Sequence, residues 1–169
     1  MENTLQSTVK GTGVVAGVAY AEAVWVRPRP ELPTEGSIDQ EASSEAEYDR
    51  FLEAVDVVAS RLENRAAAAE GQASEVLTAT AGMVKDRGWH KAVRKNIRSG
   101  KNAEFATVGA TDKFVTMFEA AGGVMAERTT DLKDVRDRVI AQLRGEQEPG
   151  LPMVEGQAVL FADDLAPAD

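Results

Sequence analysis

The feature that most constrains this fold is a run of about thirty residues, 37–69, in which apolar side chains recur every three or four positions. This spacing is typical of one face of a helix, and the run is longer than most globular helices. Ser37 is expected to cap the helix and Gly71 to end it. The apolar positions are Ile38, Ala42, Phe51, Leu52, Val55, Ala59, Leu62, Ala66 and Ala69.

Three further helices are expected after Gly71. The second begins at Ser74 and is bent at Gly88, where the apolar pattern is interrupted before Trp89 resumes it. The third is capped by Asn102 and ends at the pair 122–123, and the fourth runs through residues 124–145. Because short connections join these helices, they are expected to pack antiparallel as a four-helix bundle.

The two ends of the chain have a different character. Residues 8–26 are rich in Val and Gly and predict two short strands, residues 27–36 hold three prolines and predict a linker, and residues 158–162 predict a buried strand. The expected fold is therefore mainly α: an antiparallel four-helix bundle with a bent second helix, inserted between strands of a truncated α/β domain. The expected divisions are 1–30, 31–147 and 148–169, the middle one being the helical domain.

Composition excludes several classes of function. A net charge of −9 argues against nucleic-acid binding, and the absence of cysteine removes disulfides and thiolate metal sites. No apolar run reaches membrane-spanning length and the first ten residues are polar, so a soluble cytoplasmic protein is expected. The densest basic stretch is either a solvated helix face or a surface that meets a phosphate or an acidic partner. It comprises Lys91, Arg94, Lys95, Arg98 and Lys101.

Residues that carry chemistry are few. The segment 11–16 has the glycine spacing of a dinucleotide loop, but a Val-rich strand and not a helix is expected to follow it. His90 is the single histidine; it is either a surface imidazole or a nucleophile oriented by Asp86. No catalytic residue and no metal site are therefore assigned. Met83, Met117 and Met125 are either core residues or flexible side chains that accept a partner.

Four segments, in order along the chain, resemble phosphoenolpyruvate-protein phosphotransferases, the Enzyme I family of the bacterial sugar phosphotransferase system. Gly11–Ala23 (GTGVVAGVAYAEA) is similar to the family's opening glycine-rich segment, and Ala79–Asp86 (ATAGMVKD) to a stretch on its second helix. Thr130–Arg138 (TDLKDVRDR) resembles a signature on the fourth helix, and Ala158–Pro167 (AVLFADDLAP) a segment of the form D-L-x-P that precedes the active histidine. Together these matches span nearly the whole chain.

The resemblance implies a helical domain that docks the phosphocarrier protein HPr, next to an α/β domain whose histidine passes phosphate from phosphoenolpyruvate to HPr. That histidine lies in a G-G-x-x-S-H motif which these 169 residues lack, so the chain is expected to be a fragment truncated before it and inactive alone. No cofactor is expected for the fragment. Magnesium, and a homodimer through a C-terminal domain, are implied only for the full-length enzyme.

By family position, HPr would contact the second helix, the bend after it, and the facing ends of the third and fourth helices. The chain departs from the family pattern at Thr80, where His is common, and at Arg87 and Gly88, where acids are common, while HPr generally presents a basic rim. The implied contact residues are Thr80, Gly82, Met83, Asp86, Arg87, Met117, Ala120, Val124, Met125 and Arg128.

Two other functions stay open from the residues alone. The chain could be a stand-alone helical adaptor for protein interaction, which would shift no HPr resonance on mixing. It could also be an enzyme that uses His90, which phosphoenolpyruvate and magnesium would label directly.

Overall fold

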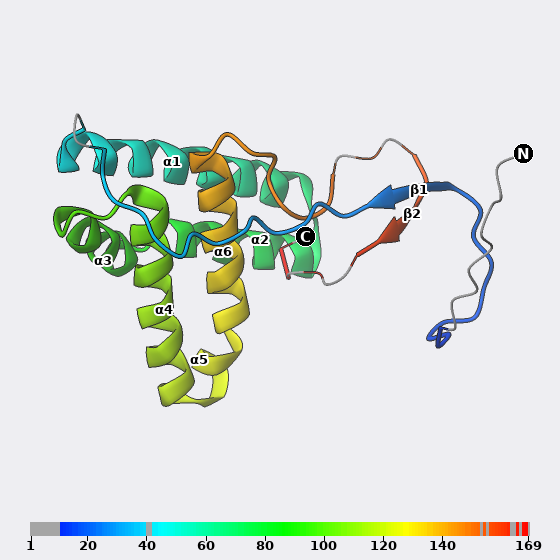
Figure 1. Ribbon diagram of the computed structural model, residues 1–169. Helices are drawn as coiled ribbons and strands as arrows, with labels where there is room; N and C mark the ends of the chain where they lie inside the picture. The colour runs from blue at the N-terminus through cyan, green and yellow to red at the C-terminus, as the bar shows by residue number, and fades with distance from the viewer. Residues whose placement is uncertain are drawn as a thin grey trace, which may run out of the picture.

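The computed structural model describes residues 11–39, 42–152, 154, 156–162, 165 and 167–168, so Asp163 and Asp164 of the last family-like segment lie outside it. The protein is mainly helical with one two-stranded sheet (Figure 1). Its elements are β1 (Glu22–Trp25), α1 (Ser44–Ala68), α2 (Gly71–Val84), α3 (Arg87–Arg98), α4 (Ala103–Ala121), α5 (Gly123–Glu127), α6 (Thr129–Leu143) and β2 (Ala158–Phe161).

The helices pack in two groups. α1 lies along α2, and α4 runs beside α6, with the short α5 closing the far end of that pair (Figure 1). α1 contacts α6, which joins the two groups, and α3 packs against both α4 and α1. The far ends of α4 and α6 extend beyond α1, while the sheet stands off the helices on another side of the molecule (Figure 1).

The core fills the space between these groups. Trp89 and Phe51 meet edge to face with their ring centroids 5.5 Å apart, and the Trp89 indole N–H donates to the Thr111 hydroxyl at 3.2 Å. This bond satisfies the polar atom of the largest buried side chain, as burial requires. Other fully buried members are Val58, Ala59, Leu62, Val84, Val93, Ile97, Ala103, Val135 and Val139.

The first helix starts later than its sequence predicts. Its N-cap is Ser43, whose hydroxyl accepts from the Ala46 N–H at 3.0 Å, and not Ser37. Ser37 instead forms an antiparallel bridge with Lys101, and the Ile38 N–H donates to the Gly100 carbonyl at 3.0 Å. This pairing with a distant turn holds the segment extended, which no local pattern reveals.

The turn between α1 and α2 also differs from the prediction. α1 ends at Ala68, and Gly71, expected as its terminator, is the first residue of α2 with φ +59°. Ser74, expected as the next N-cap, lies inside α2 and donates its hydroxyl to the Ala66 carbonyl at 2.8 Å. The serine therefore ties the two helices together instead of starting one.

The predicted second helix is interrupted, but at residues 85–86 and not at Gly88, which lies inside α3, whereas the start of the predicted third helix follows the prediction. α2 ends at Val84, and the Asp86 carboxylate caps α3 by accepting from the Trp89 N–H at 2.7 Å. Asn102 caps α4 by accepting from the Phe105 N–H at 2.9 Å. Both caps are local interactions of a side chain with the backbone three residues on; the sequence predicts the cap at Asn102, whereas the cap at Asp86 is a finding of the structure.

The expected fourth helix is divided into α5 and α6, which meet at Arg128. Gly122 caps α5 and Gly123 is its first residue, with φ +68° and +55°, in the left-handed region that favours glycine. The chain thus reverses sharply between α4 and α5.

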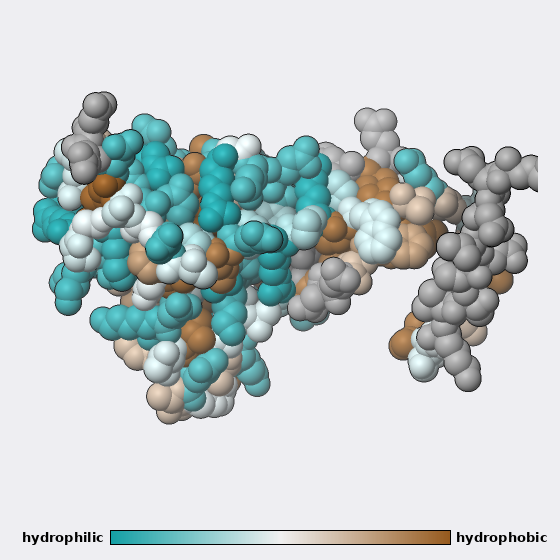
Figure 2. Space-filling view, in the orientation of Figure 1, coloured by the Kyte–Doolittle hydropathy of each residue, from teal (hydrophilic) through white to brown (hydrophobic). Residues whose placement is uncertain are grey.

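The sheet contains one strand from each end of the chain. β1 pairs in parallel with β2, from Glu22 opposite Ala158 to Trp25 opposite Phe161, so the strand predicted at 158–162 is present, but it is not buried, since Leu160 and Phe161 are 45% and 41% exposed. Of the two strands predicted near the N-terminus, only β1 is present in the described residues. Val14, Val15, Val18 and Tyr20 are fully or almost fully exposed, and among the described residues no strand pairs with their segment. Figure 2 shows apolar surface gathered around the two strands.

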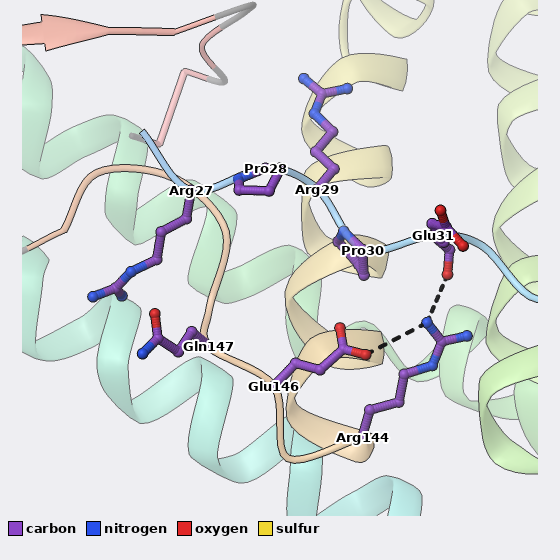
Figure 3. A pocket seen from close by; sticks show the side chains of 8 residues that line it. All are labelled: Arg27, Pro28, Arg29, Pro30, Glu31, Arg144, Glu146 and Gln147. Atoms are coloured by element: carbon purple, nitrogen blue, oxygen red, sulfur yellow. Dashed lines mark hydrogen bonds and ion pairs between the residues drawn. The ribbon is translucent and has the colours of Figure 1, made fainter. Parts of the chain in front are cut away.

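The two segments that connect sheet and helices run together. Arg27 and Gly150 exchange backbone hydrogen bonds of 3.1 and 3.2 Å, and Arg144 donates to the Glu31 carbonyl at 2.7 Å (Figure 3). The buried Arg138 holds the returning segment through Glu148 at 2.6 Å. The predicted domain boundaries at 30/31 and 147/148 lie close to the Arg27–Gly150 pair and stay a prediction.

Candidate functional site

An open groove lies where the bend between α2 and α3 faces α4 and the α5–α6 turn. It has a volume of about 700 Å³ and is the site considered below as the apolar groove. Its lining consists of Ala79, Gly82, Met83, Asp86, Trp89, Phe114, Phe118, Val124, Met125, Arg128 and Leu132.

The floor of the groove continues the core. Trp89 and Leu132 are buried, and Met83, Phe114 and Phe118 are partly buried and pack against the core. The two phenylalanines stand one helical turn apart on α4 with their rings edge to face at 6.2 Å. A partner seated here would therefore meet a firm apolar surface.

The edge of the groove on the α5 side is apolar and exposed. Val124 is 69% exposed and Met125 is 40% exposed, although both are large hydrophobic side chains. Neither is needed by the core, and they stand beside a partly apolar floor. Exposed apolar residues gathered in this way are typical of an interaction surface.

Two local features of the chain shape the groove. A Cβ placed on Gly88 would lie 3.1 Å from the Asp86 carboxylate, so glycine leaves room for the α3 cap, and that position lies 3.6 Å from the Phe114 ring of α4. The reversal at Gly122 and Gly123 brings Val124 and Met125 back toward the bend. Sequence positions more than thirty residues apart thus meet across one surface.

The groove carries few charges. The Asp86 carboxylate accepts the hydrogen bond that caps α3, and Arg128 lies exposed on the opposite wall. Next to Arg128, burial raises the pKa of Asp131, and the arginine charge offsets only part of that rise. The centre of the site is therefore apolar and its charges stand at the margins.

The ten residues implied by family resemblance divide into two sets. Six line the groove: Gly82, Met83, Asp86, Val124, Met125 and Arg128. The other four, Thr80, Arg87, Met117 and Ala120, do not line it. Thr80 is 3% exposed and donates its hydroxyl to the Val76 carbonyl within its own helix at 3.0 Å, whereas the other three are exposed.

Sequence reasoning missed five lining residues, among them Phe114 and Phe118. Their spacing of four residues on α4 marks them as one face, but the same spacing is expected of core positions. An aromatic pair close to the helix end and facing a glycine turn is the signal that was available. The other missed residues are Ala79, Trp89 and Leu132.

His90 supports the bend and is not oriented for chemistry. Its Nε2–H donates to the Val84 carbonyl at 2.8 Å, and its ring meets Phe51 edge to face at 5.4 Å. The Asp86 carboxylate, considered as its orienting acid, instead accepts from Trp89. The imidazole thus satisfies an end carbonyl of α2.

Other candidates for chemistry find no support in the described part of the chain. The glycines of 11–16 are followed by β1 and not by a helix whose N–H groups would meet a phosphate. No group of three or more His, Asp or Glu among the described residues lies together as a metal site. The described helices include none with the length and apolar character needed to cross a membrane.

Two clusters of charged residues brace the helices away from the groove. Arg50 contacts Glu47 at 2.7 Å and Glu104 at 2.8 Å, joining α1 to α4, and the Ala103 N–H also donates to Glu47. Burial would raise the pKa of Glu47, but these hydrogen bonds and the arginine charge lower it below its usual value. The second cluster centres on Arg138, which contacts Asp134 at 2.7 Å.

Comparison with known proteins points to one family. The family model described as "PEP-utilising enzyme, N-terminal" matches residues 10–128. Among curated proteins, the phosphoenolpyruvate-protein phosphotransferase of Streptomyces coelicolor is 37% identical over 98% of this chain and 30% of its own length. The protein of the same name from Bacillus subtilis is 34% identical over 95% of this chain and 29% of its own length. The chain thus spans about 30% of these relatives.

Solved structures share the fold. An NMR solution structure of an Enzyme I protein has a TM-score of 0.73 and 22% identity, over 88% of this chain and 62% of that one. The N-terminal domain of a nitrogen Enzyme I has a TM-score of 0.65 and 22% identity, over 90% of this chain and 63% of that one. With the family model covering most of the chain, the resemblance to Enzyme I is confirmed, and the protein belongs to the family of PEP-utilising enzymes, of which it carries the N-terminal part.

Proposed function

We propose that this chain is the HPr-docking part of an Enzyme I, the phosphotransferase that passes phosphate from phosphoenolpyruvate through a histidine to HPr for sugar uptake. The observation that carries the proposal is the apolar groove, which gathers six of the ten family-implied contact residues from two separate segments, 82–86 and 124–128. The names of the relatives, phosphoenolpyruvate-protein phosphotransferase, support the parent activity.

The physical character of the groove suits a carrier that must leave quickly. A small apolar floor with charges at its margins gives a modest interface, and such interfaces release their partners rapidly. Met83 and Met125 offer flexible side chains that adapt to a partner surface. The groove is also open, so a folded protein can reach its floor.

Docking, and not phosphoryl transfer, is the role proposed for these residues. Their single histidine, His90, is held by Val84 and Phe51, and the sequence contains no G-G-x-x-S-H motif. Magnesium is proposed for the full-length enzyme only, since the described residues offer it no group of three or more donors. Dimerisation is likewise assigned to a C-terminal domain outside this sequence.

The finer features of the proposal follow from the same resemblance. We describe the helices as a four-helix bundle with its second helix divided into α2 and α3 and its fourth into α5 and α6, inserted into an α/β domain represented by β1 and β2. The family places such a domain in the cytoplasm, which the absence of cysteine suits.

The test is a titration of isotope-labelled HPr from the same organism with this chain. Wild-type chain is expected to shift a contiguous set of HPr amide resonances, and Met125→Asp is expected to weaken binding about tenfold or more because it puts a charge into the apolar contact. Val57→Asp is the matched control: Val57 is 37% exposed on α1, close to the 40% of Met125, and lies outside the groove.

The outcomes separate the competing functions. Equal affinities of the Met125→Asp and wild-type chains would place HPr elsewhere, and the absence of any HPr shift would favour a stand-alone adaptor. Labelled phosphoenolpyruvate with magnesium is then added; transfer of label to this chain would revive His90 as a phosphate acceptor.

A further inference from the structure

A second groove, of about 610 Å³, runs along α3 and faces α4. Five cationic side chains line it, together with Gly88, Ala92 and Phe114. These five cations are called the basic surface here: Lys91, Arg94, Lys95, Arg98 and Lys113. The sequence marks four of them as a basic helix face, and the structure adds Lys113 from α4.

Within the part of the chain that the structure describes, the cations of the basic surface have no acidic partner. No carboxylate lines the groove, and among the described residues none of the five cations lies within ion-pair distance of an Asp or Glu. Arg94 stacks over the Tyr48 ring at 4.9 Å, which fixes the guanidinium without neutralising it. In a chain of net charge −9, five unneutralised cations in one groove are an exception that calls for a partner.

The basic surface adjoins the apolar groove. Phe114 lines both grooves, and the Cβ position of Gly88, which lines the basic one, lies 3.6 Å from that ring. A folded protein seated on Met83, Phe118 and Met125 would therefore extend its edge over α3. Arg87, where the family commonly has an acid, adds a further exposed cation at the start of the same helix.

We propose that the basic surface binds an acidic patch on the same carrier protein that docks in the apolar groove, so that the charged edge of the complex has the opposite polarity to the family's usual basic carrier rim. This inference rests on the proposed docking function and adds the chemistry of the partner. Carboxylates of a partner in contact with the basic surface interact more strongly with its cations than with the net charge of the chain, because the Debye length is about 8 Å at physiological salt. An extended polyanion such as a nucleic acid would reach beyond this small surface and be repelled by the negative charge of the rest of the chain.

The experiment compares two charge-neutralised variants by calorimetric titration with HPr from the same organism. Lys95→Gln with Arg98→Gln removes two cations from the last turn of α3, inside the basic surface. Arg61→Gln with Arg65→Gln removes two cations near the end of α1, outside both grooves, and serves as the control. Circular dichroism checks that both variants keep their helices.

The expected result is a loss of affinity of about fivefold to tenfold at low salt for the α3 variant, less than twofold for the control, and a difference that shrinks as salt rises. HPr amides next to Asp or Glu should shift with wild-type chain and lose that shift with the α3 variant. These results would support the acidic patch.

Unchanged affinity of the α3 variant, with wild-type binding intact and Met125→Asp still weak, would overturn this inference and leave the docking function standing. Failure of the wild-type chain to bind HPr would overturn both this inference and the proposed docking function. Inorganic phosphate or an oligonucleotide that binds wild-type chain but not the α3 variant, while HPr affinity is equal, would assign the surface to a different anion and also overturn the inference.

Discussion

Asp86 illustrates how one side chain serves both folding and the site. Its carboxylate caps α3 through the Trp89 N–H, and the cap fixes the bend at which α2 turns toward the apolar groove. The same cap takes up the carboxylate that was considered as an orienting acid for His90, and it positions the buried Trp89 beneath the groove.

Replacing Asp86 by alanine is expected to lower the free energy of unfolding by about 1 kcal/mol, because the Trp89 N–H loses its acceptor. Asp86→Asn should retain most of the stability, since asparagine caps as well as aspartate does. Urea denaturation followed by circular dichroism measures both; an alanine variant as stable as wild type would show that the cap contributes nothing.

Glu47 makes stability depend on pH in a defined direction. Its pKa is lower in the folded protein than in the unfolded chain, so its contribution is complete above the unfolded pKa of about 4.3 and is lost as the pH falls through the folded value. Thermal melts of Glu47→Gln should therefore show a smaller loss of melting temperature between pH 7 and pH 3 than wild type.

Asp131 makes stability depend on pH in the opposite direction, so its variant is a control for the same thermal melts. Its pKa is raised on folding, so its contribution is present below the unfolded pKa of about 3.9 and is lost as the pH rises through the folded value. Asp131→Asn should melt slightly higher than wild type at pH 7. If both variants changed the pH profile in one direction, the assigned environments would be wrong.

At the scale of helices and strands, the sequence predicts what local interactions decide. The cap at Asn102 and the reversal at Gly122 are set within a few residues, and both lie where the pattern places them. Ser37 fails as a cap because Ile38 pairs with Gly100, sixty-two positions away, and the second N-terminal strand fails for lack of a neighbour. Such pairings depend on the assembled fold.

The apolar groove was only partly predictable for a related reason. Periodicity tells which residues share a helix face, but it does not tell whether that face is covered by another helix or left open. Family position indicates Met83 and Met125, whereas the four-residue spacing of Phe114 and Phe118 is the spacing that core positions also have. The open face exists because α5 turns back at the glycine pair instead of covering it.

The glycine pair therefore controls both stability and the groove. Gly123→Ala is expected to destabilise the protein by about 1 kcal/mol, because φ +55° is costly for any residue with a Cβ. Gly82→Ala is the matched control: Gly82 is inside α2 with open space around its Cβ position, and alanine there should stabilise by up to about 1 kcal/mol. Urea denaturation of the two variants should give changes of opposite sign.

At the scale of the whole molecule, Arg138 connects the helices to the chain that returns to the sheet. Its side chain is fully buried between Asp134 and Glu148, and burial would lower its pKa were it not for these two carboxylates, which raise it. The charge therefore stays on the guanidinium throughout the range of folded stability. The contact is the anchor of the returning segment.

Arg138→Met is expected to destabilise the protein by about 3–5 kcal/mol, since it leaves buried Asp134 without this cation. Arg138→Met combined with Asp134→Leu should recover much of the loss, because no buried carboxylate then remains at that position. Chemical denaturation of both variants tests this; a double variant less stable than the single would show that the carboxylate itself is needed.

The backbone bridge between Arg27 and Gly150 bears on whether the helical part can be moved to another protein. Because the chain enters and leaves the helical part at adjacent backbone positions, that part can be inserted into a surface loop of an unrelated host protein without spreading the loop. The two ends of residues 27–150 therefore lie side by side, which is the geometry that a loop insertion requires.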